Sequence, residues 1–444
     1  MNPRHTGRRW LAASLLGLLG SLAALPAHAL PSFSRQTGEE CTACHIGGFG
    51  PQLTPHGMKF KIGGYTDSDG KDGHVPLSAM LIGNSANLRK GSADLIADGA
   101  QRSNNNLSLQ EFSVFVAGRL APHVGTFTQV TYSGIENKTA IDNMDVRIAR
   151  EFEVNGSPTT FGVSVNNSPT TQDPFNTLPA WRFPYTSPDL TFGPGASTLL
   201  DGTLEQAVLG TTAYAFTEGG LLVEAGGYNN IGRRTLKRLG VMPDAVLDRT
   251  APYGRIALLK DYRKQAFSVG MVGMQAHVRP LDDPSGSADK LTDVGIDGSW
   301  QYLGNRRHIF TVDGSVIRER QDRLVTAADN PSGTLYQSTV AGSYYYEQKY
   351  GLTARLFNTH GSSDATYYGD GFRNGSPDSR GYTLQADWTP LSKSERFGTF
   401  LNLRLGMQYT GYTMFNGANS QQTYDGTRRP GDNNTFSVFV WGAY

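Results

Sequence analysis

The stretch LNLRLGMQYT, residues 401–410, decides the fold class of this chain. Apolar side chains occupy its odd-numbered positions, and polar residues or glycine occupy the even-numbered ones. Successive side chains of a β-strand point to opposite faces, so a repeat of two places all the apolar side chains on one face. The stretch therefore predicts a β-strand with one apolar and one polar face.

The same alternation recurs throughout residues 76–444, for example in VGIDGSWQY at 294–302 and YTLQADW at 382–388. Aromatic residues gather near the ends of these segments, as the girdles at a membrane surface require. We identify about sixteen such segments. They lie near residues 77–92, 107–120, 124–135, 142–154, 158–166, 204–216, 219–228, 252–261, 264–278, 290–303, 306–319, 335–348, 350–359, 380–390, 398–412 and 434–444.

The connections between the segments alternate in length. Short connections at 217–218, 303–305 and 349 are interleaved with long polar ones at 168–203, 229–251 and 361–379. Short turns at one end and long loops at the other are typical of outer-membrane barrels. The predicted fold class is therefore mainly β, a transmembrane antiparallel β-barrel of about sixteen strands with both termini on the periplasmic side.

The polar face of the segments separates this fold from a soluble β-sandwich or propeller. Such a protein would pack its apolar faces against a second layer, and its polar faces would meet bulk water. Here the polar faces carry Asp297, Asp387, Arg404 and Gln408, which suit the lumen of a barrel better. The final segment ends on an aromatic residue, Tyr444, and it resembles the terminal recognition strand of outer-membrane proteins.

Composition and charge exclude two other classes of protein. Beyond the N-terminus the chain has no apolar run of the roughly 20 residues that a membrane-spanning helix needs. The net charge is +1, with 40 Lys and Arg against 39 Asp and Glu, so no electrostatic argument supports nucleic acid as a partner.

The first residues predict an export signal. Arg4, Arg8 and Arg9 precede an apolar stretch at 10–25, and Ala27-His28-Ala29 has the small residues of a cleavage site. We therefore expect residues 1–29 to be a signal peptide that is removed, and not a retained membrane anchor.

One chemical motif stands out, Cys41-Thr42-Ala43-Cys44-His45. This C-x-x-C-H spacing is the attachment site of c-type haem, in which the histidine binds the iron. A redox dithiol does not need the adjacent histidine and is expected in a βαβ context. A zinc site would need two further ligands, and the chain has no other cysteine. The motif predicts one covalent haem c, bound by Cys41 and Cys44 and ligated by His45.

The second axial ligand of the iron stays open at this stage. The candidates downstream are His56, Met58, His74 and Met80. Met58 follows a glycine-rich stretch that could fold back over the haem, whereas Met80 opens the first predicted strand with its side chain on the inward face. A thioether ligand would raise the reduction potential relative to a second histidine. A sixth position without a protein ligand is the remaining alternative.

The motif and its surroundings resemble the fused cytochrome-porin family. FSRQTG at 33–38 leads into the haem motif, and LTPHGMKFK at 53–61 follows it, ahead of the barrel. That family includes outer-membrane iron oxidases of iron-oxidising bacteria. The resemblance implies a signal peptide at 1–29, a monohaem cytochrome c segment at 30–75 that plugs the barrel, and an outer-membrane barrel at 76–444.

The expected function follows from this arrangement. A segment as short as residues 30–75 buries little surface by itself, but the lumen of a barrel of about sixteen strands can enclose it. We expect the haem to pass electrons from an extracellular donor, with Fe(II) as a candidate, to periplasmic c-type cytochromes. The alternative is a haem-plugged outer-membrane channel for solute transport or sensing.

Overall fold

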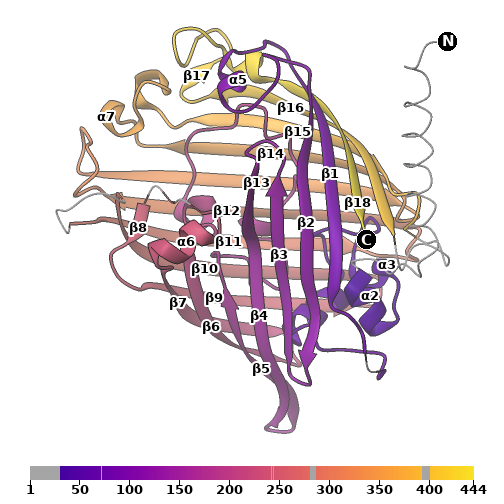
Figure 1. Ribbon diagram of the computed structural model, residues 1–444. Coiled ribbons are helices and arrows are strands. Elements are labelled where there is room, and N and C mark those ends of the chain that lie inside the picture. Colours follow the sequence, from indigo (N-terminus) through magenta and orange to yellow (C-terminus); the bar gives the residue numbers. More distant parts are fainter. Residues whose placement is uncertain (1–30, 72, 242, 244, 281–286, 393–400) are drawn as a thin grey trace, which may run out of the picture.

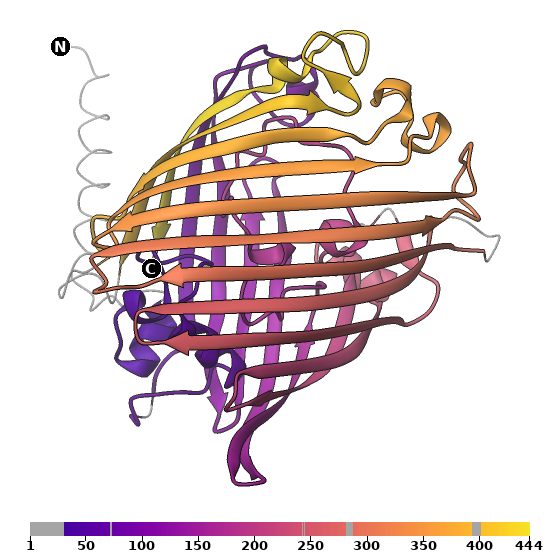
Figure 2. The ribbon, with the colours of Figure 1, turned by 180° about the vertical axis from the view of Figure 1, so that it is seen from behind.

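The computed structural model describes residues 31–71, 73–241, 243, 245–280, 287–392 and 401–444. The predicted signal peptide at 1–29 lies outside the described residues. A single sheet of strands curves round and closes on itself to form a barrel (Figure 1). Seen from behind, the strands of the far wall cross those of the near wall at a steep angle, because all of them are tilted from the barrel axis (Figure 2).

The sheet contains eighteen described strands, and sixteen of them form the wall. The wall strands are β1 (Leu77–Leu88), β2 (Asn106–Ala121), β3 (Val124–Ser133), β4 (Lys138–Val154), β5 (Ser157–Asn166), β6 (Val208–Thr217), β7 (Leu221–Asn230), β9 (Ala251–Tyr262), β10 (Gln265–Pro280), β11 (Asp289–Tyr302), β12 (His308–Asp322), β13 (Ser332–Tyr346), β14 (Tyr350–Gly361), β15 (Ser379–Trp388), β16 (Asn402–Phe415) and β18 (Thr435–Ala443). Each wall strand pairs antiparallel with the next, and β1 pairs with β18 to close the ring. The predicted count and the positions of all sixteen segments are confirmed.

Two short strands were not predicted. β8 (Ala245–Leu247) adds to the edge of β10, and β17 (Ala418–Asn419) folds back on β16. With three and two residues, neither is long enough to show an alternation in the sequence.

The outer surface of the barrel is apolar. On β18, Phe436, Val438 and Val440 are 45%, 46% and 42% exposed, while the intervening Ser437 and Phe439 are buried. The same pattern of exposed Leu, Val, Ile and Phe side chains occurs on the other wall strands. Only lipid can cover so continuous an apolar band at low free-energy cost, so the barrel is a transmembrane barrel.

The two ends of the barrel differ. β1 begins and β18 ends at the end that also carries the short turns, such as the one between β6 and β7. The opposite end carries the long connections, with α5 (Asp94–Ala97), α6 (Arg233–Arg238), α7 (Ala365–Tyr368) and β17 (Figure 1). The predicted alternation is thus confirmed with two exceptions. The β3–β4 connection at residues 134–137 is short but lies at the long-loop end, and the β15–β16 connection at residues 389–401 is long but joins strands at the short-turn end.

The segment before the barrel forms three short helices: α2 (Pro31–Thr37), α3 (Cys41–Cys44) and α4 (Pro55–Ile62). In Figure 1 they lie at the end of the barrel where the C-terminus also lies. Pro55 occupies the first turn of α4, and the Thr54 hydroxyl accepts a hydrogen bond from Gly57 N, as is usual at a helix N-terminus. We call residues 31–75 the plug. In the described part of the chain, no helix is long and apolar enough to span a membrane.

The long connection between β5 and β6, residues 167–207, folds into the lumen and not out of the barrel; we call it the lumen loop. Phe175, Leu178 and Phe183 on it are at most 2% exposed. Asp173 forms an ion pair of 3.2 Å with Arg255, which also binds the Asp297 carboxylate at 2.8 Å. The charged side chains predicted to face inward do face the lumen. They form ion pairs and hydrogen bonds with other protein groups, whereas the sequence analysis expected them to meet water.

Candidate haem site

The predicted haem motif lies on one helical turn of the plug. The amide of His45 donates a hydrogen bond of 2.8 Å to the carbonyl of Cys41, and the amide of Thr54 donates one of 2.9 Å to the carbonyl of Cys44. Gly57 of α4 lies against α3 so closely that a Cβ there would be 2.3 Å from the Cys44 carbonyl oxygen. The absence of a side chain at Gly57 therefore allows α4 to pack directly against α3, which carries the motif.

Cys41, Cys44 and His45 all border one cavity of about 440 Å³ inside the barrel. The plug, the barrel wall and the lumen loop each contribute to its lining. Its other lining residues include Phe33, Phe49, Phe60 and Tyr65 of the plug, Met80, Phe115, Phe127, Asn402 and Trp441 of the wall, and Asn176, Trp181, Tyr185 and Glu205 of the lumen loop. A volume of roughly 300–1,000 Å³ is usual for the binding site of a small organic molecule.

The motif side chains themselves fit a covalent haem. Both cysteines are free thiols, and burial raises the pKa of Cys41 to about 11 and that of Cys44 to about 12. Thiols that resist deprotonation do not suit a redox dithiol, which needs the thiolate. Nδ1 of His45 is buried without a hydrogen-bond partner among the described residues, and burial lowers the pKa of His45 to about 4. A neutral imidazole is the form that binds a metal ion.

The walls of the cavity fit a porphyrin as well. Phe49 meets Trp441 edge to face, with 5.1 Å between ring centroids, and Phe115 lies 5.6 Å from Phe127. Phe33 stacks on Tyr65 at 5.5 Å. These rings form apolar surfaces around the motif of the kind that a buried haem requires.

The structure separates the four candidates for the second axial ligand. Met80 points inward from β1 as predicted, is 7% exposed, and lines the same cavity as His45. Met58 instead packs in an apolar cluster with residues such as Phe175 and Leu222, outside the cavity lining. His56 pairs with Glu39 at 2.7 Å and His74 with Asp69 at 2.9 Å, and neither borders the cavity. Met80 is therefore the candidate that shares a cavity with His45.

The wall holds the turn after the motif through contacts that the sequence analysis did not foresee. Arg404 Nη2 donates hydrogen bonds of 2.8 and 2.5 Å to the carbonyl oxygens of Gly47 and Phe49. The amide of Gly47 donates one of 2.8 Å to Gln348. A Cβ on Gly47, whose φ is +77°, would lie 2.5 Å from the ring of Tyr345. The sequence identifies Arg404 as facing the lumen, but only the fold brings it to the plug.

Acidic side chains border the cavity on the side of the lumen loop. Glu111, Asp142 and Glu205 line it. Desolvation inside the lumen, followed by the negative charges of Asp142 and Asp201, raises the pKa of Glu205 to about 7. The sequence shows no clustered carboxylates in the long loops, and these three come instead from β2, β4 and the lumen loop.

A separate group of possible metal ligands lies next to the motif, in the plug. One ligand atom each of Glu39, Cys44 and His56 lies within 4.8 Å of the others. Because Cys44 belongs to the haem motif, the group shares a residue with the candidate haem site and is not independent of it.

Comparisons with known proteins return other barrels. No protein-family model and no curated protein sequence matches the chain. Among solved structures, OmpT of Vibrio cholerae is 11% identical, with a TM-score of 0.43 over 83% of this chain and 96% of that one. The anion-selective porin of Comamonas acidovorans is 11% identical, with a TM-score of 0.47 over 83% and 98%. OmpF of Salmonella typhi is 12% identical, with a TM-score of 0.45 over 83% and 97%. At such low identities and scores, the fold rests on the strand pairing of the chain itself.

Proposed function

We propose that the protein is a bacterial outer-membrane electron-transfer protein with one covalent haem c inside its barrel. Cys41 and Cys44 would hold the haem covalently, and His45 and Met80 would bind its iron. The observation that carries this proposal is the meeting of these four side chains at one cavity, which plug, wall and lumen loop enclose together. When bound, the haem supplies a one-electron redox centre.

The residues around the cavity set the conditions for that redox centre. Phe49, Phe115 and Trp441 supply apolar surface beside the motif, and apolar surroundings raise the reduction potential of a haem. Met80 acts in the same direction, because a thioether ligand favours the reduced iron. His45 is kept neutral by burial, so its imidazole is available to the iron at neutral pH.

The filled lumen supports the passage of electrons in preference to solutes. The plug occupies the end of the barrel at which β1 begins and β18 ends, and the lumen loop lies inside the barrel. Lys61 of the plug donates hydrogen bonds of 2.9 Å to the Thr171 carbonyl and 3.0 Å to Asn176, so the plug and the lumen loop are joined. A haem in this position spans part of an otherwise insulating membrane.

The partners follow from the two ends of the barrel. We propose periplasmic c-type cytochromes at the short-turn end, where β18 ends, and an extracellular donor at the long-loop end. Glu111, Asp142 and Glu205 offer carboxyl oxygens as ligands for a metal cation, and Fe(II) is the donor that we propose.

A second candidate function is a channel with a haem plug for solute transport or sensing. A closed barrel of sixteen strands is wide enough for an aqueous pore, and cavities border the lumen loop on both sides. These observations favour a channel if the plug or the lumen loop can move.

Reconstitution in liposomes separates the two functions. A haem protein trapped inside the vesicles reports electrons that cross the membrane, while a trapped dye reports solute leak. If the protein transfers electrons, external Fe(II) should reduce the trapped haem protein without loss of the dye. The Cys41→Ala, Cys44→Ala double variant should then show no such reduction. Dye loss together with an unreduced trapped reporter contradicts electron transfer and establishes the channel.

A further inference from the structure

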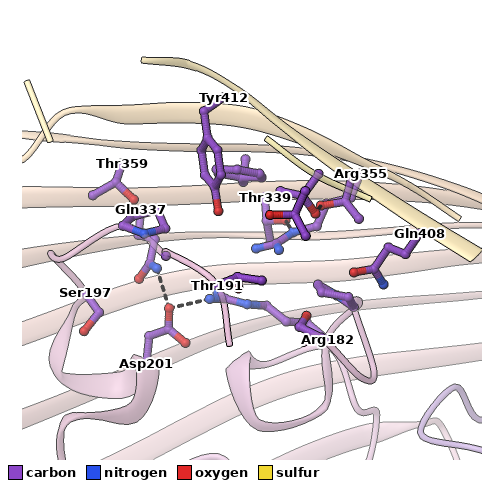
Figure 3. A pocket seen from close by; sticks show the side chains of 18 of the residues that line it. Arg182, Thr191, Ser197, Asp201, Gln337, Thr339, Arg355, Thr359, Gln408 and Tyr412 are labelled. Carbon is purple, nitrogen blue, oxygen red and sulfur yellow. Dashed lines mark hydrogen bonds and ion pairs between the residues drawn. The ribbon is translucent and has the colours of Figure 1, made fainter. Parts of the chain in front are cut away.

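A second cavity, of about 280 Å³, lies on the other side of the lumen loop from the haem motif. The lumen loop provides one wall of it, and strands β13 to β16 and β18 provide the other (Figure 3). None of the haem-motif residues lines it. The cavity is therefore a separate site within the same lumen.

Two guanidinium groups border this cavity, but only one of them is neutralised by an ion pair. Arg182 binds the carboxylate of Asp201, which also accepts a hydrogen bond from Gln337 (Figure 3). Arg355 uses its Nε to donate a hydrogen bond of 2.8 Å to the Thr339 hydroxyl. Its terminal nitrogens have no ion-pair or hydrogen-bond partner in the described part of the chain. The guanidinium stacks over Phe357, with 5.1 Å from Cζ to the ring centroid.

The charge of Arg355 is thus left without an ion-pair partner among the residues that the structure describes. The positive charge of Arg182 acts on it unfavourably and the charges of Asp201 and Asp313 act on it favourably, but neither aspartate forms an ion pair with it. A charge kept away from bulk water without a partner is costly. An anion in the cavity would relieve this cost.

The remaining lining favours an oxyanion. Ser197, Thr359 and Ser437 border the cavity, and their hydroxyls form no hydrogen bond within the described residues. The planar fork of an arginine matches the oxygens of carboxylate and phosphate groups, and free hydroxyls add further donors. A volume of about 280 Å³ lies at the lower limit for small organic ligands, so the ligand is an ion or a very small molecule.

We propose that this cavity binds a small oxyanion, carboxylate or phosphate, with Arg355 as its principal ligand. The proposal is independent of the haem, because it concerns residues that do not border the haem cavity. It gives a binding role to the cavity beside strands β13 to β16 and β18, which takes no part in the electron-transfer proposal.

Equilibrium dialysis of the haem-loaded, full-length protein in detergent tests the proposal. Radiolabelled inorganic phosphate is one probe and labelled acetate is the other, so that the two oxyanion classes are measured separately. The expected result is saturable binding of one of them at one site per chain. Arg355→Gln should weaken that binding by about tenfold or more, since it removes a charged hydrogen-bonding group.

Arg318→Gln is the matched control. Arg318 also stacks on an aromatic ring, Tyr336 at 5.9 Å, but it is exposed on the outside of the barrel. Heat-modifiable gel mobility shows whether each variant is folded, and Arg355→Lys, which keeps the charge, replaces Arg355→Gln if the latter does not fold. Arg355→Lys should weaken binding measurably, because a lysine lacks the planar guanidinium, but less than a variant that has lost the charge. Absence of saturable binding of both probes, or equal weakening by Arg318→Gln, overturns the proposal and leaves the haem function untouched.

Discussion

Arg404 of β16 donates a hydrogen bond of 2.8 Å from Nη2 to the carbonyl oxygen of Gly47, two residues beyond the haem motif. Arg404 also binds the Phe49 carbonyl and lies 3.6 Å from the Asp387 carboxylate, with 1% of its surface exposed. A residue near the C-terminus thus fixes the turn that follows His45. The candidate haem site therefore needs both the plug and strand β16.

Replacing Arg404 should loosen the plug. Arg404→Gln removes the ion-pair partner of the buried Asp387 carboxylate, which then keeps only the hydrogen bond from Gln385; the loss of one partner of a buried ion pair typically costs about 3–5 kcal/mol. We expect a folded barrel by gel mobility but faster trypsin cleavage within α4, which carries Lys59 and Lys61. Arg380→Gln, at an exposed position on β15, is the control. If trypsin cleaved the plug equally slowly in the wild type and in Arg404→Gln, Arg404 would not be needed to hold the plug.

Met80 and Met58 should respond differently to the same substitution. Met80→Ala should remove the charge-transfer band of a His–Met haem and lower the reduction potential, because the thioether favours reduced iron. Met58→Ala should keep the band but lower the free energy of unfolding by about 2–5 kcal/mol, as expected for a buried core methionine. Loss of the band in Met58→Ala with its retention in Met80→Ala would reverse the assignment.

The reduction potential should depend on pH through Glu205. Desolvation inside the lumen and the nearby charges of Asp142 and Asp201 raise the pKa of this carboxylate to about 7, so Glu205 becomes negatively charged as the pH rises through neutrality. A negative charge near the haem stabilises the oxidised iron, so the potential should fall between about pH 6 and 8. Redox titrations of Glu205→Gln should show a smaller fall over this interval. An unchanged slope would mean that the Glu205 charge does not reach the haem.

Protease accessibility should report the orientation of the barrel. Arg233 and Arg234 lie in the long connection that carries α6, whereas Arg263 and Lys264 form the short turn between β9 and β10, and all four are exposed. Trypsin added to intact cells should cut in the first region and spare the second until the outer membrane is permeabilised. Cleavage confined to the short turn would invert the barrel.

The wall of the barrel could be predicted from sequence because each strand carries its own signal. Alternation in residues 401–410 is enough to place Arg404 inside and Met407 outside, and the same reasoning places Met80 inside. These are local properties of a strand with a different solvent on each face. The short β8 and β17 lack the length to show them.

The site could be predicted only in part. The C-x-x-C-H spacing identifies Cys41, Cys44 and His45, but the choice between Met58 and Met80 depends on packing across the whole barrel. The inward fold of the lumen loop was not expected from its polar composition. Its signal was the set of apolar residues Phe175, Leu178 and Phe183, which an exposed loop would not need. The anchoring role of Arg404 had no local signal at all.

The covalent attachment of haem is the central claim, and haem staining of denaturing gels tests it most directly. The protein should be expressed with its signal peptide in a host that matures c-type cytochromes, since attachment takes place after export. We predict a haem-stained band for the wild type and none for the Cys41→Ala, Cys44→Ala double variant, with the barrel of both shown to be folded by its heat-modifiable mobility. A folded wild-type barrel without haem, or a stained band that survives both substitutions, would contradict the account.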